Sequence, residues 1–297
     1  MTDDHVYLSL AEGSEEGEAR WAFGTGFEDP LHGVDTAVPE ELDSRILAAY
    51  CLALGDDALV LAQRLAEWCT RAPELEEEVA LANIGLDLLG QARLLLSRAG
   101  QAEGAGRDED ALAYFRNADA FRNVRLAELP NGDFAFSIAR LLVMATWRLA
   151  LFERLTESKD PVLAAVAAKG VKELTYHRDY TAQWTVRLGD GTQESHRRMQ
   201  RGIEEIWPYT GELFTTAPPE REATEAGIGI DPATVREDVE ATLRQVADAA
   251  TLTLPVIPTL TASPRTGGGR VGKHTDALAP LLTELQSVAR AHPEATW

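Results

Sequence analysis

Apolar residues recur every three or four positions through most of the chain, which is the spacing of one face of an α-helix. This pattern predicts four long helices, over residues 46–68, 76–99, 133–157 and 161–189. Asp133 stands where a helix-capping carboxylate is expected, and Asp160-Pro161 combines a cap with a first-turn proline. Gly55 marks a point where the first of these helices could bend or divide.

Weaker helical patterns follow the fourth long helix. They predict helices over residues 192–213, 232–250 and after Thr275, with Pro208 bending or breaking the first of them. Residues 215–231 are rich in proline and acid, so we expect a loop there. The segment TLTLPVIPTL is the only candidate strand, and its prolines disfavour a strand. The sequence therefore predicts an all-α fold, a four-helix bundle with additional C-terminal helices.

The first 38 residues are polar, glycine-rich and acidic, which predicts a mobile extension before a helical domain over residues 39–297. Forty-eight acidic against 28 basic residues give a formal net charge of −20. Such a charge disfavours nucleic-acid binding, because phosphate contact requires a basic stripe. No basic segment with an apolar run begins the chain, and no uninterrupted apolar run approaches about 20 residues. We therefore expect a cytoplasmic protein that does not bind a membrane.

Two of the long helices resemble the helices that hold metal ions in other four-helix proteins, but they lack the residues that would bind the metal. Four-helix proteins that bind two iron ions place a Glu-x-x-His pair on each of two helices. At the matching positions of the second long helix stand Leu88 and Gln91. The fourth long helix keeps the acid as Glu173 but has Tyr176 in place of the histidine. The chain is therefore expected to bind no metal of its own.

An alternative metal site uses Glu173 and His177, which share one helix face at a spacing of i and i+4. Acids on other helices could complete it, namely Glu67, Asp87 and Glu153. This alternative would make the chain an autonomous metalloenzyme. A metal-free core in which Glu173 is hydrogen-bonded to Tyr176 or His177 is the favoured interpretation. Nucleophilic catalysis has little support, because the chain contains no Gly-x-Ser-x-Gly motif and neither cysteine lies near a histidine in the sequence. A pair of Cys69 with His177 stays open, although no feature favours it.

Arginines gather on the connection between the second and third long helices. The motif Phe-Arg-Asn occurs at residues 115–117 and again at 121–123, and Arg125 follows. Arginine suits phosphate, because its planar guanidinium donates hydrogen bonds in pairs. These arginines either pair with Asp119 or Glu109 at the surface or contact a phosphorylated cofactor or an acidic partner.

The segment GGGRVGK over residues 267–273 has the glycines of a phosphate-binding loop. It lacks two parts of that motif, since His274 follows the lysine in place of Ser or Thr and no strand precedes the loop. We interpret it as a flexible basic loop.

Several ordered blocks of the chain resemble the C-type subunits of the bacterial 1,2-phenylacetyl-CoA epoxidases. They are LGDDALVLAQRLAEWC (54–69), APELEEEVALANIGLDLLGQARLLL (72–96), LPNGDFAFSIAR (129–140), AAKGVKELTYHRDYTAQWTVRLGDGT (167–192), GGGRVGKHTDALAPLLTELQ (267–286) and the terminal HPEATW. The likeness runs from about residue 44 to the C-terminus.

The resemblance implies a ferritin-like helical subunit that holds no cofactor and no catalytic residue. It implies pairing with a homologous A-type subunit that carries a di-iron centre, together with a B-type subunit plus an iron–sulfur flavoprotein reductase. That assembly would epoxidise the ring of phenylacetyl-CoA with dioxygen and NADPH, a step in aerobic phenylacetate degradation. This chain would then stabilise the catalytic A-type partner. A helical scaffolding or regulatory protein with no link to oxygenation remains a third hypothesis.

Coenzyme A carries phosphates, so one member of such an assembly is expected to present basic residues to the thioester. The best candidates form one segment, Ala120, Phe121, Arg122 and Asn123. Arg221 is a weaker candidate.

Overall fold

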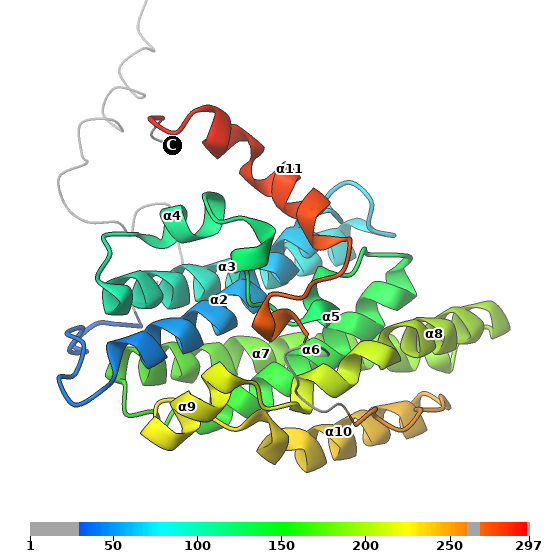
Figure 1. The fold of residues 1–297 in the computed structure, drawn as a ribbon. Helices are drawn as coiled ribbons and strands as arrows, with labels where there is room; N and C mark the ends of the chain where they lie inside the picture. Colours follow the sequence, from blue (N-terminus) through cyan, green and yellow to red (C-terminus); the bar gives the residue numbers. More distant parts are fainter. Residues whose placement is uncertain (1–29, 260–267, 296–297) are drawn as a thin grey trace, which may run out of the picture.

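Four long helices form the centre of the structure, a computed structural model that describes residues 30–259 and 268–295 (Figure 1). They are α2 (Ser44–Ala66), α3 (Leu75–Glu103), α6 (Phe134–Leu155) and α7 (Pro161–Gly189). α2 packs along α3, α6 packs along α7, and contacts between α3 and α7 join the two pairs. The two described ranges contain helices and no strand, which confirms the predicted all-α fold.

The capping residues act as the sequence predicts. The carboxylate of Asp133 accepts a hydrogen bond from the Phe136 N–H at 2.9 Å, and that of Asp160 accepts one from the Leu163 N–H at 2.8 Å. Each bond satisfies a backbone donor that the first helical turn leaves unpaired. α2 runs through Gly55 without a break.

Shorter helices surround the four long ones. They are α4 (Glu109–Tyr114), η1 (Ala118–Ala120), α5 (Arg125–Glu128), α8 (Gln193–Ile206), η2 (Trp207–Phe214), α9 (Pro218–Ala226), η3 (Pro232–Val235), α10 (Arg236–Ala249), η4 (Gly269–Val271) and α11 (Leu278–Ala291). α8 and α10 pack on α6 and α7, α9 packs on α2, and α11 packs on α4 (Figure 1). The change from α8 to the 3₁₀ helix η2 falls next to Pro208, which confirms the predicted break.

The predicted loop over residues 215–231 is wrong, because α9 lies within it. Its prolines occupy the first turn, where the missing N–H costs no helical hydrogen bond. The Glu220 carboxylate accepts a hydrogen bond from the Ala217 N–H at 2.7 Å and so fixes the start of the helix. Proline in this segment therefore begins a helix.

The packed part of the chain begins before residue 39. Of the predicted mobile extension, residues 1–29 lie outside the described ranges. In the remainder, the Thr36 carbonyl accepts hydrogen bonds from Arg98 at 2.7 Å and from Gln101 at 2.9 Å. Arg98 is itself buried in an ion pair with Asp160. Residues 30–38 thus pack against α3 and the start of α7.

Three helices, α2, α3 and α6, are long and apolar enough to cross a membrane by length and composition alone. None of the three helices is an uninterrupted apolar run, because charged residues interrupt each of them, as Asp56 does in α2, Asp87 in α3 and Arg148 in α6. Inside the bundle, 72% of the most apolar stretch of α2 and 89% of that of α6 are buried. For α3 the share is 44%, and Leu75, Val79, Leu86 and Leu89 of this helix are exposed.

Candidate functional site

One buried arginine connects all four long helices at the centre of the bundle. Arg148 of α6 donates from Nε to Oε1 of Gln91 on α3 at 2.9 Å and from Nη1 to the Leu54 carbonyl of α2 at 3.1 Å. The Gln91 amide donates onward to Oε2 of Glu173 on α7 at 2.9 Å. We call Arg148, Gln91 and Glu173 the Arg148 relay.

The Arg148 guanidinium lies near both acidic and basic groups, since beside the larger effect of burial Asp57 and Glu173 raise its pKa and Arg270 lowers it. Burial lowers the pKa of Arg148 to about 10, so the guanidinium stays charged at neutral pH. It lies over the Phe152 ring, 4.4 Å from the centroid. The ammonium of Lys169 lies 3.0 Å from Oε1 of Glu173, so this carboxylate already has a cationic partner.

These residues do not fit a pair of metal ions. A divalent cation requires several carboxylate or imidazole donors and is repelled by a fixed guanidinium. Across residues 30–259 and 268–295, no three His, Cys, Asp or Glu side chains gather where they could hold a metal ion. The polar groups of the relay are thus one amide, one carboxylate and one guanidinium, and the guanidinium cannot bind a metal ion.

The alternative site with Glu173 and His177 does not assemble either. The His177 ring is buried and lies with Nε2 2.9 Å from Oδ2 of Asp87 on α3. Glu173 is bonded to Gln91 and to Lys169. The expected hydrogen bond from Glu173 to Tyr176 or His177 is therefore wrong, because α3 supplies a partner for each of the two groups.

The structure separates the four positions that the sequence assigned to a lost metal site. Gln91 and Glu173 do face each other at the centre of the bundle. Leu88 is buried in the apolar core. Tyr176 is 50% exposed, so its side chain points away from the centre. On α7 the inward position belongs to its neighbour His177, one residue further along the helix.

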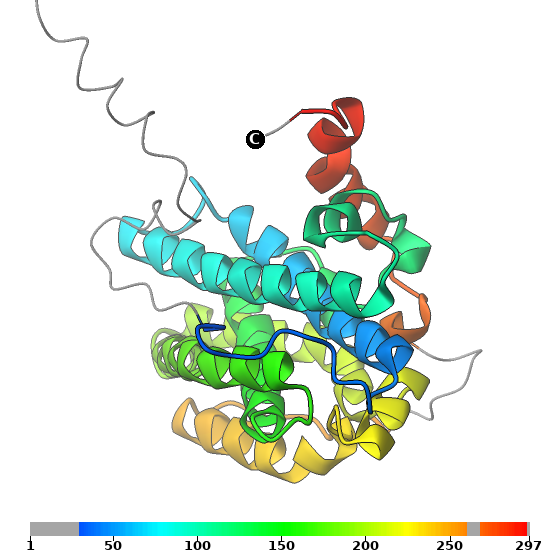
Figure 2. The ribbon, with the colours of Figure 1, turned by 90° about the vertical axis from the view of Figure 1, so that its left-hand side faces the viewer.

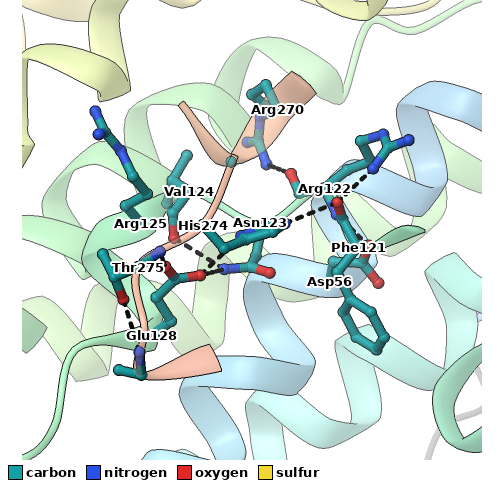
Figure 3. Close-up of polar contacts among 12 residues, drawn as sticks. Asp56, Phe121, Arg122, Asn123, Val124, Arg125, Glu128, Arg270, His274 and Thr275 are labelled. Carbon is teal, nitrogen blue, oxygen red and sulfur yellow. Dashed lines mark hydrogen bonds and ion pairs between the residues drawn. The ribbon is translucent and has the colours of Figure 1, made fainter. Parts of the chain in front are cut away.

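The segment proposed to contact coenzyme A is partly buried, and Figure 3 shows the polar contacts of three of its residues, Phe121, Arg122 and Asn123. Phe121 and Asn123 are fully buried. The Phe121 ring lies under the Arg116 guanidinium, 4.1 Å from its carbon, and the Asn123 amide donates to Oε2 of Glu128 at 2.9 Å. Ala120 is half-buried. These contacts fix the segment against Arg116 and Glu128. Its contact with coenzyme A stays a prediction.

Arg122 and Arg221 are the two basic candidates. The half-buried Arg122 donates from Nη1 to the carbonyls of Asp119 at 2.8 Å and Phe121 at 2.6 Å, so its charge is not neutralised by a directly bonded carboxylate. Arg221 is exposed on α9. Two surface hollows, of about 320 and 660 Å³, lie near the end of α3, and neither is lined by residues 120–123 or by Arg221.

The described part of the GGGRVGK segment, residues 268–273, is not a flexible basic loop, so that expectation is wrong for these residues. Arg270 is buried and donates to both carboxylate oxygens of Asp57, at 2.8 and 2.7 Å, and to Oε1 of Glu220 at 2.7 Å. Burial alone would lower the pKa of Arg270, but these two carboxylates outweigh it and raise that pKa. A Cβ on Gly269 would lie 1.7 Å from the Asn123 carbonyl oxygen, so only glycine permits this close approach.

Further contacts fasten the same C-terminal segment to the bundle. His274 lies with Nδ1 2.8 Å from Oε2 of Glu128 (Figure 3). The Gly269 N–H donates to Glu212 at 2.7 Å. Beside them, Asp56 is paired with Arg116, and burial raises the pKa of Asp56 although Arg116 opposes the shift. Sequence analysis missed this network, although charged residues within the apolar α2 and α6 sequences were a signal, because a buried charge requires a partner.

Comparison with known proteins decides the family. The sequence model of the family described as "Phenylacetic acid catabolic protein" matches residues 33–297. The chain belongs to this family. Among phenylacetic acid catabolic proteins it is similar to the C subunit of the 1,2-phenylacetyl-CoA epoxidase of Escherichia coli (strain K12). The two are 48% identical over 251 residues, which cover 84% of this chain and 99% of that relative. The resemblance found in the sequence is thus confirmed, and the all-α bundle is the ferritin-like fold of this family.

Proposed function

We propose that this chain is the structural member of a phenylacetyl-CoA epoxidase complex, and that it pairs with a homologous catalytic bundle and stabilises it. The observation that carries the proposal is the Arg148 relay. A ferritin-like bundle that serves as a di-iron enzyme needs carboxylates and histidines at its centre, and this bundle has a guanidinium there. Its similarity to the C subunit of the Escherichia coli epoxidase supports the same role.

In the proposed complex the catalytic partner and this chain have different roles. Dioxygen would be activated at the di-iron centre of the partner, with electrons from NADPH through the reductase. This chain would contribute no reacting group. Its rigid surface would hold the catalytic bundle in shape and border the path of the coenzyme A thioester. A bundle freed from binding metal can join its helices by neutral and charged hydrogen bonds, as the relay does.

Metal analysis tests this proposal. The chain is purified alone and again after co-expression with its proposed catalytic partner, and iron is measured per protein. We expect iron near zero in the isolated chain and about two iron ions per heterodimer in the complex. Stoichiometric iron in the isolated chain would overturn the proposal and favour the autonomous metalloenzyme.

A further inference from the structure

Exposed apolar side chains cluster on one side of α3. Leu75, Val79, Leu86 and Leu89 are 71, 52, 54 and 37% exposed. At about 100° per residue these four positions fall within an arc of about 80°, so they form one stripe along the helix. The stripe extends over about 14 steps of about 1.5 Å, or roughly 21 Å. A row of this kind is the ridge that one helix presents to another.

Residues 30–259 and 268–295 leave this stripe uncovered. α3 is apolar enough to be a core helix, yet its buried share is far below that of α2 and α6. Figure 2 shows α3 crossing the front of the molecule with no other helix drawn over it. Several large apolar side chains exposed on one side of a helix are unfavourable unless a partner buries them.

α7 extends the same surface. The contacts of Asp87 with His177 and of Gln91 with Glu173 fix α3 and α7 as antiparallel neighbours. Tyr176 therefore lies at the level of Leu86 and Leu89 on the outer side. Its half-exposed ring stacks on Tyr180 with centroids 6.3 Å apart. We call Leu75, Val79, Leu86, Leu89 and Tyr176 the α3/α7 face.

The charges beside the face indicate what covers it. Glu76, Glu77 and Glu78 occupy the first turn of α3, next to Leu75 and Val79. Helices that lie on anionic membranes carry lysine and arginine at such positions, so these acids disfavour a membrane. They favour a protein helix whose apolar stripe is bordered by basic residues. A ridge of this length also suits a long helix better than a short peptide.

We propose that the α3/α7 face is the surface on which a long helix of the homologous catalytic partner docks. This inference rests on the proposed function, which supplies the partner. The docked helix packs its apolar stripe between Leu86, Leu89 and Tyr176 and places basic side chains opposite Glu76–Glu78. A stable interface buries roughly 1,200 Å² or more in total, so residues of α3 and α7 beside the face contribute to it as well.

A matched pair of substitutions tests the docking surface. Leu86→Glu places a charge on the face, and Val288→Glu places one on α11, where the side chain is equally exposed, at 54%. Each full-length variant is titrated with the catalytic partner by calorimetry, and its thermal midpoint is measured alone. We expect Leu86→Glu to weaken binding at least about tenfold and Val288→Glu to change it less than about twofold. Both variants should keep the thermal midpoint of the unsubstituted chain, because neither side chain is buried.

The outcomes separate this inference from the proposed function. If the unsubstituted chain does not bind the catalytic partner, the proposed function fails. If it binds, and both Leu86→Glu and the independent variant Val79→Glu bind equally well, the α3/α7 face is not the docking surface while the function stands. Light scattering and flotation with phosphatidylglycerol vesicles test other occupants. A homodimer or a vesicle complex that Leu86→Glu abolishes would overturn the choice of partner.

Discussion

Arg148 donates to Gln91 and to α2, so its replacement tests whether the relay joins the helices. Arg148→Met keeps most of the side-chain volume but leaves the Gln91 carbonyl without its donor. We expect the free energy of unfolding to fall by about 1–3 kcal/mol. Gln91→Leu should also destabilise, since it leaves the buried guanidinium without its side-chain acceptor. The loss of unfolding free energy in the double variant should be smaller than the sum of the two single losses by about 1 kcal/mol. Urea unfolding curves of the three variants give this comparison.

The control for this cycle lies on the same helix. Arg154 pairs with Asp238, whose side chain is 65% exposed, so Arg154→Met should cost no more than about 0.5 kcal/mol. Strict additivity of Arg148→Met and Gln91→Leu would show that the relay has no energetic coupling.

Arg122 is the member of the 120–123 segment best suited to bind an anion. Among the described residues its guanidinium donates to two carbonyl oxygens and to no carboxylate, so the charge is available to a phosphate. In the assembled enzyme, Arg122→Ala should raise KM for phenylacetyl-CoA about tenfold with little change in kcat, because an interaction removed equally from substrate and transition state affects binding alone. Arg201→Ala is the control, since Arg201 is paired with Glu205 on the surface of α8. An unchanged KM would end the assignment of Arg122 to coenzyme A.

At the residue scale, the helical frame of a metal site correctly placed Gln91 and Glu173 on the inner sides of their helices, where they are bonded to each other. That bond was not predicted, because spacing along one helix does not show which groups of two helices meet. The i to i+4 spacing of Glu173 and His177 instead favoured a hydrogen bond between those two residues, and each of them is bonded to α3. Tyr176 was placed inward because a single sequence does not fix the rotation of a helix about its axis. The partnership of Arg270 with Asp57 joins residues 213 apart in the chain, and no local pattern reveals it.

At the scale of elements, two helix glycines in different surroundings offer a matched test of packing. A Cβ added at Gly90 of α3 meets no atom within 4 Å, whereas one added at Gly170 of α7 would lie 2.6 Å from Cδ1 of the buried Phe152. Gly90→Ala should therefore stabilise the isolated chain by about 0.5–1 kcal/mol, because alanine favours the helix. Gly170→Ala should destabilise it by about 1–3 kcal/mol through overpacking. Thermal unfolding of both variants gives the comparison, and equal stabilisation by the two would contradict the close contact of α6 with α7.

The long helices were predictable because an apolar stripe and a capping aspartate coincide at their starts, as at Asp133 and Asp160. α9 was missed because prolines indicate a loop unless the turn after them is known to be helical. The conformation of residues 268–273 depends on Asp57, Glu212 and Glu220, which come from three distant elements. The local sequence does not reveal such distant partners, and the prediction of a flexible loop over residues 267–273 was therefore wrong for its described part.

At the scale of the whole molecule, two kinds of charge respond differently to salt. The ion pairs of Arg98 with Asp160, Arg116 with Asp56 and Arg270 with Asp57 are buried and are screened weakly. The acidic excess behind the net charge of −20 is spread over the rest of the chain. Exposed like charges repel one another in the folded state, and that repulsion is screened over about 10 Å at about 0.1 M salt.

Added salt should therefore stabilise the isolated chain. Between low salt and about 0.3 M sodium chloride we expect the thermal midpoint to rise by a few degrees, where roughly 2–4 °C corresponds to about 1 kcal/mol for a domain of this size. Sodium bromide at the same ionic strength should act alike, because screening depends on ionic strength. A rise confined to sulfate would indicate exclusion of the salt from apolar surface such as the α3/α7 face. A fall in chloride would mean that exposed pairs such as Arg201 with Glu205 stabilise the fold more than the acidic excess destabilises it.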